Sequence, residues 1–320
     1  MTSRLAIALL VCACSGRGSP PVGSRLGPAL AAALAAADNA REPWRCAAPD
    51  GPGLPAEALT VGTRTWQLGG AAMQLPAGDE LAIGVIADAA DSAPATLAAL
   101  GRLRAELEHV DLVISLGGMG ATRAELEATF AALASHASWP LVAMPGDLEP
   151  IEAHAEAVAA ARQGGTPVID GRLVQRIELP VATIALVPGA GAAGRLVSGA
   201  DGCSYRTADV AAVLADLTGR PGLRILASAE PPRSASRDEP SGELAVTAGA
   251  GYEIDLALHG PTTGAASPPR TGRRDGSAVP LTPGSSDAAP RLPGFYRRPS
   301  AGILTLRREA WSWKSIEDVK

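Results

Sequence analysis

The chain has 320 residues, of which 47% are hydrophobic, and its 33 acidic and 28 basic residues give a formal net charge of −5. A chain of this length and apolar content can bury a full core, so one large domain is expected. The acidic balance excludes the basic surface on which general nucleic-acid binding depends, and we expect no nucleic-acid partner.

The N-terminus has the features of a targeting segment. Leu5–Val11 is an apolar stretch that is too short to span a bilayer and is typical of a secretory signal. The residues after it resemble a bacterial lipobox, in which the small Ala13 makes Cys14 the better lipid acceptor; an ordinary signal peptide cut further on is the alternative. By the same resemblance, Ser15 is typical of outer-membrane lipoproteins. We expect residues 1–13 to be a signal peptide and Cys14 to anchor the chain to the membrane, in the bacterial cell envelope at the periplasmic face of the outer membrane.

The segment after the signal predicts a tether and then an extension. Residues 14–27 are rich in Gly, Ser and Pro and predict a flexible tether, and residues 28–80 form an N-terminal extension. Once the signal is removed and the lipid attached, Cys46 and Cys203 are the remaining thiols. An exported compartment is oxidising, so we expect a disulfide between them, which would stabilise the fold by roughly 3 to 5 kcal/mol. Two separate buried thiols are the alternative.

From residue 81 onward, short apolar runs alternate with amphipathic segments, which predicts a layered α/β domain over 81–320. Buried strands are expected at Leu81–Ile86, Asp111–Leu116, Trp139–Met144, Leu173–Ile177, Val181–Val187, Arg224–Ser228 and Ile254–Leu258. Helices are expected near Pro94, after a capping box formed by Thr122 and Glu125, at Pro150–Arg162, and after a cap at Thr207. Gly302–Arg307 and Ala310–Ile316 predict a closing antiparallel hairpin.

Two segments lack the apolar residues that would order them. Residues 265–293 are dominated by Pro, Gly, Ser, Ala and Arg and predict a disordered insertion within the domain. Residues 233–243 are polar and predict a mobile loop.

Five of the expected strands end in a turn that carries glycine, an acidic residue or a small residue. These turns are Ala87–Ala90, Gly117–Gly118, Gly146–Leu148, Ala227–Pro232 and Gly260–Gly264. Their order and spacing resemble the calcineurin-like metallophosphoesterase family, whose ligands follow strands as Asp-x-His, Gly-Asp, Gly-Asn-His, His and Gly-His-x-His. The resemblance runs from about residue 81 to the C-terminus. It implies an α/β fold, a metallophosphoesterase-like two-sheet sandwich flanked by helices.

Most of the family's ligands are replaced in this sequence. Asp88 keeps the first aspartate and Asp147 stands in place of the asparagine. The remaining positions carry Ala90, Gly118, Leu148, Ala229, Pro261 and Thr263, where the family has histidines or the bridging aspartate. The resemblance therefore implies a cleft that is a relic of an active site, with no catalytic residue. The relic positions are Asp88, Gly117, Gly118, Gly146, Asp147, Ala229, His259, Gly260 and Thr263.

The chemistry of a two-metal centre makes these losses hard to replace. Two adjacent dications need a bridging anionic oxygen, and Gly118 has no side chain to supply one. Transition metals favour imidazole, and no histidine remains at these turns. Leu148 cannot donate a proton to a leaving group. No metal site and no cofactor are predicted; Asp88 and Asp147 could at most hold one divalent cation weakly.

Other polar residues have simpler interpretations. His109, His136 and His154 are expected to be solvated or packing residues, and Glu149, Glu152 and Glu156 a solvated helix face. Asp91 could be a helix cap or a ligand, and His259 could face the cleft or be structural.

The leading hypothesis is a catalytically degenerate metallophosphoesterase-fold lipoprotein of the cell envelope, a binding or scaffolding pseudoenzyme with an unknown protein or small-molecule ligand. One alternative is an active phosphoesterase with a remodelled metal site built from Asp88, Asp147, Glu230 and His259. Another is a structural envelope protein whose segment 265–293 contacts the cell wall or a neighbour.

Overall fold

A computed structural model describes residues 46, 51–191, 196–230, 252–261, 266–274, 278–288 and 298–318. The predicted signal peptide, the tether, the candidate lipidation residue Cys14 and the predicted loop 233–243 lie outside these residues. In the described part, no helix combines the length and apolar character needed to cross a membrane.

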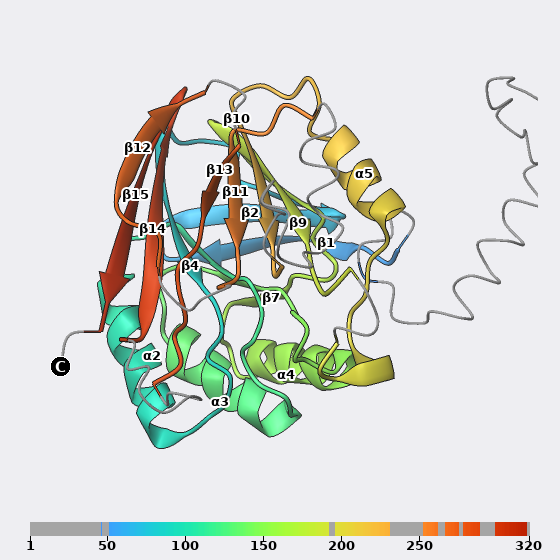
Figure 1. The fold of residues 1–320 in the computed structure, drawn as a ribbon, viewed down its shortest axis with the longest axis vertical. Coiled ribbons are helices and arrows are strands. Elements are labelled where there is room, and N and C mark those ends of the chain that lie inside the picture. Colours follow the sequence, from blue (N-terminus) through green and yellow to red (C-terminus); the bar gives the residue numbers. More distant parts are fainter. Residues whose placement is uncertain are drawn as a thin grey trace, which may run out of the picture. The chain divides into compact units, whose positions relative to one another are not determined.

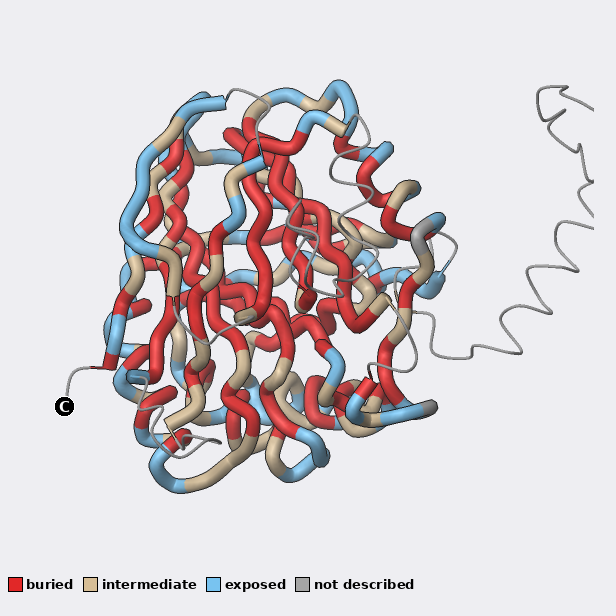
Figure 2. The backbone as a smooth tube through the Cα atoms, in the orientation of Figure 1, coloured by how far each residue is buried: buried red, intermediate tan, exposed pale blue. Residues whose placement is uncertain are grey.

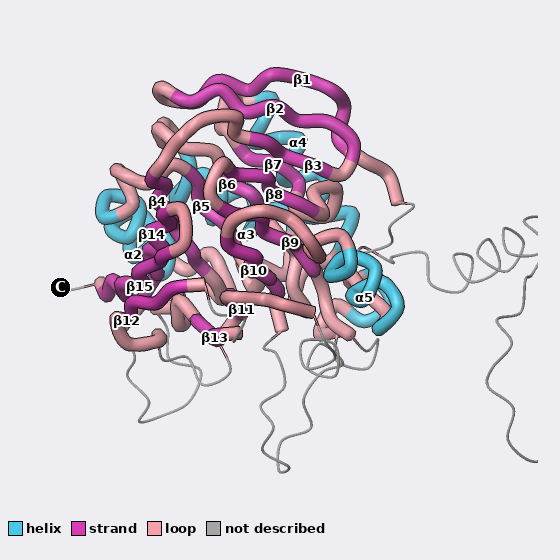
Figure 3. Tube along the Cα trace, turned by 90° about the horizontal axis from the view of Figure 1, so that it is seen from above, coloured by secondary structure: helices cyan, strands magenta, loops and turns pink. Residues whose placement is uncertain are grey.

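The described strands form two mixed sheets (Figures 1 and 3). The eight-stranded sheet has the order β1 (Leu54–Val61), β2 (Arg64–Gly70), β3 (Ala72–Gln74), β8 (Arg176–Leu179), β9 (Ala182–Val187), β10 (Leu223–Ser228), β11 (Leu256–His259) and β13 (Val279–Leu281). The seven-stranded sheet has the order β12 (Arg270–Arg273), β15 (Ala310–Glu317), β14 (Ser300–Arg307), β4 (Glu80–Ile86), β5 (Leu112–Ser115), β6 (Leu141–Ala143) and β7 (Val168–Asp170).

Helices cover the outer face of each sheet. Against the seven-stranded sheet lie α2 (Pro94–Glu106), α3 (Arg123–Ala134) and α4 (Ile151–Gln163), which share a buried cluster with it. On the eight-stranded sheet, α5 (Thr207–Ala215) shares a second cluster with β9 and β10. A third and largest cluster joins the inner faces of the two sheets, and Figure 2 shows it as the buried centre. The expected two-sheet sandwich flanked by helices is confirmed.

The central strands of the seven-stranded sheet are buried on both faces, which explains their continuous apolar sequences. β4, β5, β6 and β7 run parallel to one another. β14 runs antiparallel to β4, and β15 to β14, so the predicted closing hairpin is confirmed. Parallel strands end at the same edge of a sheet, and the turns after β4, β5 and β6 therefore meet.

Residues 54–74 belong to the sandwich, although the sequence placed them in an extension before residue 81. β3 pairs in parallel with β8, with Met73 opposite Ile177, and Trp66 and Met73 are fully buried. The signal was weak because β1 is an edge strand with mostly exposed or half-buried residues, which gives it little apolar periodicity.

The expectation of disorder throughout 265–293 is wrong for the described residues in that range. They contain β12, which pairs antiparallel with β15, and β13, which pairs in parallel with β11. These strands are ordered by their neighbours and not by their own apolar content, which a composition argument cannot detect. The rest of the range lies outside the described residues.

Two helix starts test the capping predictions. At α3 the capping box is confirmed: the Glu125 N–H donates to Thr122 Oγ1 at 3.3 Å, and the Thr122 N–H donates to Glu125 Oε2 at 3.0 Å. At α5 the predicted cap at Thr207 is wrong, because Thr207 is already the first helical residue and Arg206 occupies the cap position. The Arg206 N–H donates to Asp209 Oδ2 at 2.9 Å, so an acidic side chain of the first turn satisfies the N–H of the cap residue.

Candidate functional site

Turns from both sheets gather around one pocket of about 450 Å³. They follow β4, β5 and β6 in one sheet and β10 and β11 in the other. The pocket is lined by Asp88, Leu116, Gly117, Gly118, Gly146, Asp147, Leu148, Val197, Ala229, Glu230, Gly260 and Pro261. The five turns predicted to share a hollow therefore do share one. Thr263, the last of the positions that the sequence predicted for this site, lies outside the described residues.

The first two turns are joined through their backbones. The Asp88 N–H donates to the Gly117 carbonyl at 2.9 Å, and the Ala90 N–H donates to the Gly118 carbonyl at 2.7 Å. Asp88 and Ala90 have φ values of 55° and 67°, which L residues adopt only where neighbours hold them. This strained turn is therefore fixed by the adjacent glycines.

Gly117 and Gly118 are required by close packing as well as by backbone conformation. Their φ values are 91° and 73°. A Cβ at Gly118 would lie 2.9 Å from Asp88 Cα, and a Cβ at Gly117 would lie 2.5 Å from the Gly146 nitrogen. No side chain can be placed at either residue unless the backbone moves. The position where a bridging carboxylate would be needed thus excludes one.

Glu149 connects the second turn to the third, and the prediction of a solvated helix face is wrong for it. Its side chain is fully buried, with Oε1 accepting from the Met119 N–H at 2.6 Å and Oε2 from the Gly146 N–H at 2.8 Å. Burial raises its pKa to about 7, although the N–H donors oppose that shift. Glu152 and Glu156 are exposed, as predicted. Sequence reasoning missed Glu149 because it treated the three glutamates as one face; its position before α4, three residues after Gly146, was the available signal.

The third turn forms one wall of the pocket with Asp147 and Leu148. Asp147 is exposed, and its carbonyl accepts hydrogen bonds from the Val197 N–H at 2.8 Å and from Ser198 Oγ at 3.3 Å. Leu148 is half-buried and gives this wall an apolar surface. The Leu148 side chain itself has no proton to donate to a bound ester.

The turns after β10 and β11 close the opposite side. Glu230 is buried and accepts hydrogen bonds from the Tyr205 hydroxyl and from the Gly191 N–H at 3.1 Å. A Cβ at Gly260 would lie 2.3 Å from the Ala229 carbonyl oxygen, so these turns also pack backbone on backbone.

His259, proposed as part of a remodelled site, does not line the pocket. It is buried, and its Nδ1 lies 2.7 Å from the Gly260 carbonyl. Burial lowers the pKa of its imidazole, while that hydrogen bond opposes the shift. The remaining members, Asp88, Asp147 and Glu230, do line the pocket. Among the residues that the structure describes, no group of three His, Cys, Asp or Glu side chains is placed to hold a metal ion.

A serine-rich segment that sequence reasoning assigned to disorder supports the first turn from behind. Ser285 Oγ donates to the Asp88 carbonyl at 2.9 Å, and Ser286 Oγ donates to the Ala87 carbonyl at 2.8 Å. Ser286 is fully buried, and its N–H also donates to the Ala87 carbonyl at 3.0 Å. Residues far apart in the sequence thus fix one side of the pocket.

The other predicted polar residues have structural roles. Asp91 is not the cap of α2, because Ala93 holds that position without a side-chain cap. Asp91 Oδ1 instead accepts from the Ala93 N–H at 2.9 Å and from Thr96 Oγ1 at 3.1 Å, so it fixes the turn that leads into the helix. His109 and His136 are exposed, but His136 lies beyond the end of α3 with a φ of 60° and not on the helix. His154 is fully buried, with its ring edge-on to Phe130.

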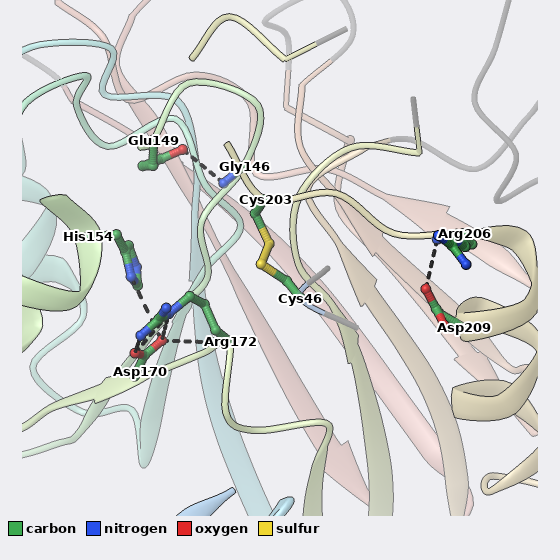
Figure 4. The surroundings of a disulfide bond; sticks show 9 residues. All are labelled: Cys46, Gly146, Glu149, His154, Asp170, Arg172, Cys203, Arg206 and Asp209. Atoms are coloured by element: carbon green, nitrogen blue, oxygen red, sulfur yellow. Dashed lines mark hydrogen bonds and ion pairs between the residues drawn. A yellow bond between two sulfur atoms is a disulfide. The ribbon is translucent and has the colours of Figure 1, made fainter. Parts of the chain in front are cut away.

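The structure joins Cys46 and Cys203 in a disulfide, as expected (Figure 4). The Cys46 N–H also donates to the Ser204 carbonyl at 2.9 Å. Gly189 has a φ of 85°, and a Cβ there would lie 2.2 Å from the Cys203 carbonyl oxygen, so only glycine fits against this loop. The disulfide therefore fixes the segment that leads to Tyr205, the hydrogen-bond partner of Glu230.

The donor set does not fit the two-metal centre that the resemblance implies. Such a centre needs a bridging anionic oxygen, and the backbone at Gly118 excludes every side chain that could supply it. The lining contains three carboxylates but no imidazole.

No protein-family model matches the chain, and no curated protein matches it. Solved structures with a similar chain path include TT1561 of Thermus thermophilus, at 14% identity and a TM-score of 0.47, covering 74% of this chain and 98% of that one. Another is the purple acid phosphatase PPD1 from yellow lupin (Lupinus luteus) seeds, at 10% identity and a TM-score of 0.49, covering 80% of this chain and 54% of that one. A third is a predicted phosphoesterase from Streptococcus pneumoniae, at 14% identity and a TM-score of 0.31, covering 75% of this chain and 91% of that one. Identities and TM-scores this low carry no inference about the function of this chain.

Proposed function

We propose that this chain is a catalytically degenerate, phosphoesterase-like protein that binds a protein or small-molecule ligand at the strand-end pocket and does not hydrolyse phosphate esters. The observation that carries the proposal is the backbone at Gly118. Its φ of 73° and the 2.9 Å approach of a Cβ to Asp88 Cα leave no room for a bridging ligand. A change in the ligand set alone, without movement of the turns, would not restore two metal ions.

The charge of the pocket supports the same conclusion. Three acidic residues, Asp88, Asp147 and Glu230, line it, and no basic side chain does so in the described part of the chain. A phosphate ester would therefore meet like charge with no cation to offset it. The Met119 and Gly146 N–H groups could otherwise receive an anion, but both donate to Glu149.

The proposal is tested by metal analysis and by turnover. Purified protein is incubated with Zn²⁺, Mn²⁺ or Mg²⁺, desalted, and analysed for bound metal by mass spectrometry. The same samples are assayed with p-nitrophenyl phosphate and bis-p-nitrophenyl phosphate. We expect no stoichiometric metal and no turnover above buffer.

Asp88→Ala is the informative variant and Asp79→Ala its control, because Asp79 is exposed and does not line the pocket. Stoichiometric metal together with turnover that Asp88→Ala abolishes and Asp79→Ala preserves would disprove the proposal. That outcome would favour a phosphoesterase with a remodelled site.

We also propose that the protein is an exported lipoprotein anchored through Cys14, on the strength of the apolar signal and the lipobox-like residues. Cells expressing the full chain are labelled with a radioactive fatty acid, and their membranes are separated. We expect label in the outer-membrane fraction for the wild type and for Cys12→Ser, and none for Cys14→Ser. Label retained by Cys14→Ser would contradict the assignment.

A further inference from the structure

A second hollow lies at the β12–β15–β14 edge of the seven-stranded sheet. The far end of β15 lies under α2, where Arg102 donates to both carboxylate oxygens of Asp318 at 2.6 and 2.7 Å. Ile316, near that end, is buried, whereas Ser312 and Thr305 are only half-buried. β15 begins at Ala310, seven residues before its last residue Glu317, which is roughly 20 Å along a strand. The helix layer does not reach this beginning of the strand (Figure 1).

The strand register arranges the uncovered face in two rows. Directly paired residues of antiparallel strands point to the same face. One row carries the hydroxyl residues Thr271, Ser312 and Thr305 on β12, β15 and β14. The neighbouring row carries Arg273, Ala310 and Arg307 on the same three strands.

Both rows line one groove of about 310 Å³, which we call the arginine groove. Its lining residues are Thr271, Gly272, Arg273, Thr305, Arg307, Ala310, Trp311 and Ser312. This volume is at the lower end of the range for small-molecule sites, roughly 300 to 1,000 Å³. The groove therefore suits a ligand about the size of a monosaccharide.

The two arginines stand on either side of a small residue. Their strands are separated by β15, which places their backbones roughly 10 Å apart, and Ala310 leaves the space between them open. Arg273 is exposed and has no ion-pair partner among the described residues. Arg307 pairs with Glu80 at 3.0 Å, but its side chain is 66% exposed, and an exposed ion pair contributes little to stability. The Arg273 guanidinium is therefore available to an anion, and the Arg307 guanidinium would leave only an exposed ion pair to reach one.

We propose that the arginine groove binds a sugar that carries an oxyanion, either a carboxylate or a phosphate. Arg273 and Arg307 hold the oxyanion above Ala310, since a guanidinium presents paired N–H donors that match either group. The hydroxyls of Thr271, Ser312 and Thr305 each donate and accept, and they receive the ring hydroxyls. This site is separate from the strand-end pocket and does not depend on the function proposed for it.

The experiment uses four probes on the full chain: glucuronate, glucose 6-phosphate, glucose and inorganic phosphate. Binding is measured by isothermal titration calorimetry, and by protein-observed NMR if heats are small. We expect at least one of the two anionic sugars to bind more tightly than glucose and than inorganic phosphate. The comparison between glucuronate and glucose 6-phosphate identifies which oxyanion the groove accepts.

Variants assign the binding to the groove. Arg273→Gln and Arg307→Gln should each weaken binding of the anionic sugar about tenfold, because each removes a charge-assisted hydrogen bond. Thr305→Val keeps the shape of the side chain and removes its hydroxyl. It should weaken the binding of the anionic sugar but not that of inorganic phosphate. Arg308→Gln is the control, since Arg308 is an exposed arginine of the β14–β15 turn that does not line the groove.

Three results would overturn the proposal. The first is that neither anionic sugar binds the wild type. The second is that inorganic phosphate binds as tightly as the sugars, which would remove the role of the hydroxyl row. The third is that Arg308→Gln weakens binding as much as the two groove variants, because the effect would then be one of general charge. All these substitutions are at exposed or half-buried positions, and a circular dichroism spectrum confirms that each variant is folded.

Discussion

Two buried ionisable residues near α4 should change the pH dependence of stability in opposite directions. Burial raises the pKa of Glu149 to about 7, against the hydrogen bonds that it accepts from backbone N–H groups. Burial lowers the pKa of His154 to about 4, against the attraction of Asp170, whose Oδ1 lies 3.8 Å from Nδ1. Both side chains are fully buried, so neither shift is reduced by exposure to solvent.

The sign for Glu149 follows from which state holds the proton. Its ordinary pKa is 4.5, so between pH 4.5 and about 7 the folded protein keeps a proton that the unfolded chain has released. The free energy of unfolding therefore falls as pH rises through that window. At about 1.4 kcal/mol per pKa unit, the whole window amounts to about 3 kcal/mol.

His154 acts the other way. Between about pH 4 and 6.5, its ordinary pKa, the unfolded chain binds a proton that the folded protein does not. The free energy of unfolding therefore rises with pH across this range, again by about 3 kcal/mol. Where the two windows overlap, from pH 4.5 to 6.5, the contributions largely cancel in the wild type.

Single substitutions should reveal each contribution. Urea unfolding is measured at several pH values between 4.5 and 6.5 for the wild type, Glu149→Gln and His154→Phe. Relative to the wild type, Glu149→Gln should gain stability as pH rises, and His154→Phe should lose it, by about 2 to 3 kcal/mol each across the range. Glu152→Gln, which changes an exposed glutamate of α4, should follow the wild type at every pH. A constant difference between Glu149→Gln and the wild type across the whole range would refute the reasoning for Glu149.

Three further predictions concern the backbone and the disulfide. Gly118→Ala should lower the free energy of unfolding by about 1 to 3 kcal/mol, because its φ is 73° and neighbouring atoms fill the space that a Cβ would need. Gly101→Ala, at a position of α2 with open space around it, should raise the free energy of unfolding by about 0.5 to 1 kcal/mol. Equal effects of the two substitutions in urea unfolding would contradict this prediction. Gly302→Ala would place a Cβ 2.0 Å from the Trp313 ring and should lower the free energy of unfolding by at least about 1 to 3 kcal/mol. The clash should also change the tryptophan fluorescence, and an unchanged midpoint of urea unfolding would exclude it. Cys46→Ser removes the disulfide and should lower the free energy of unfolding by about 3 to 5 kcal/mol. Dithiothreitol should destabilise the wild type by the same amount and leave the variant unaffected.

The strand ends that form the pocket could be predicted because apolar runs followed by glycine are local signals. Leu81–Ile86 and Asp111–Leu116 were located within one or two residues of β4 and β5, and parallel strands necessarily bring their ends together. The need for glycine at Gly118 was a different matter. The sequence indicated a lost ligand, whereas the contact with Asp88 shows that a side chain does not fit there.

What the sequence did not predict depends on long-range packing. Glu149 lies among other glutamates before a helix, and only the approach of the turn after β5 buries it. Ser285 and Ser286 lie in a segment whose composition is typical of disorder, but hydrogen bonds to carbonyl groups of the distant turn after β4 order them. In both cases the hydrogen-bond partner, and not the residue's own type, determines burial. A single sequence does not contain that pairing.

These unpredicted contacts hold the turns of the pocket together through the protein's own groups. A bound pair of metal ions would itself cross-link the turns, and its binding energy would contribute to folding. Here Glu149 joins the Met119 turn to the Gly146 turn, and the Ser285 hydroxyl holds the Asp88 turn in place. The shape of the pocket is therefore maintained by hydrogen bonds within the protein. The proposed loss of histidines at its rim would remove chemistry from the site without removing the contacts that keep it open.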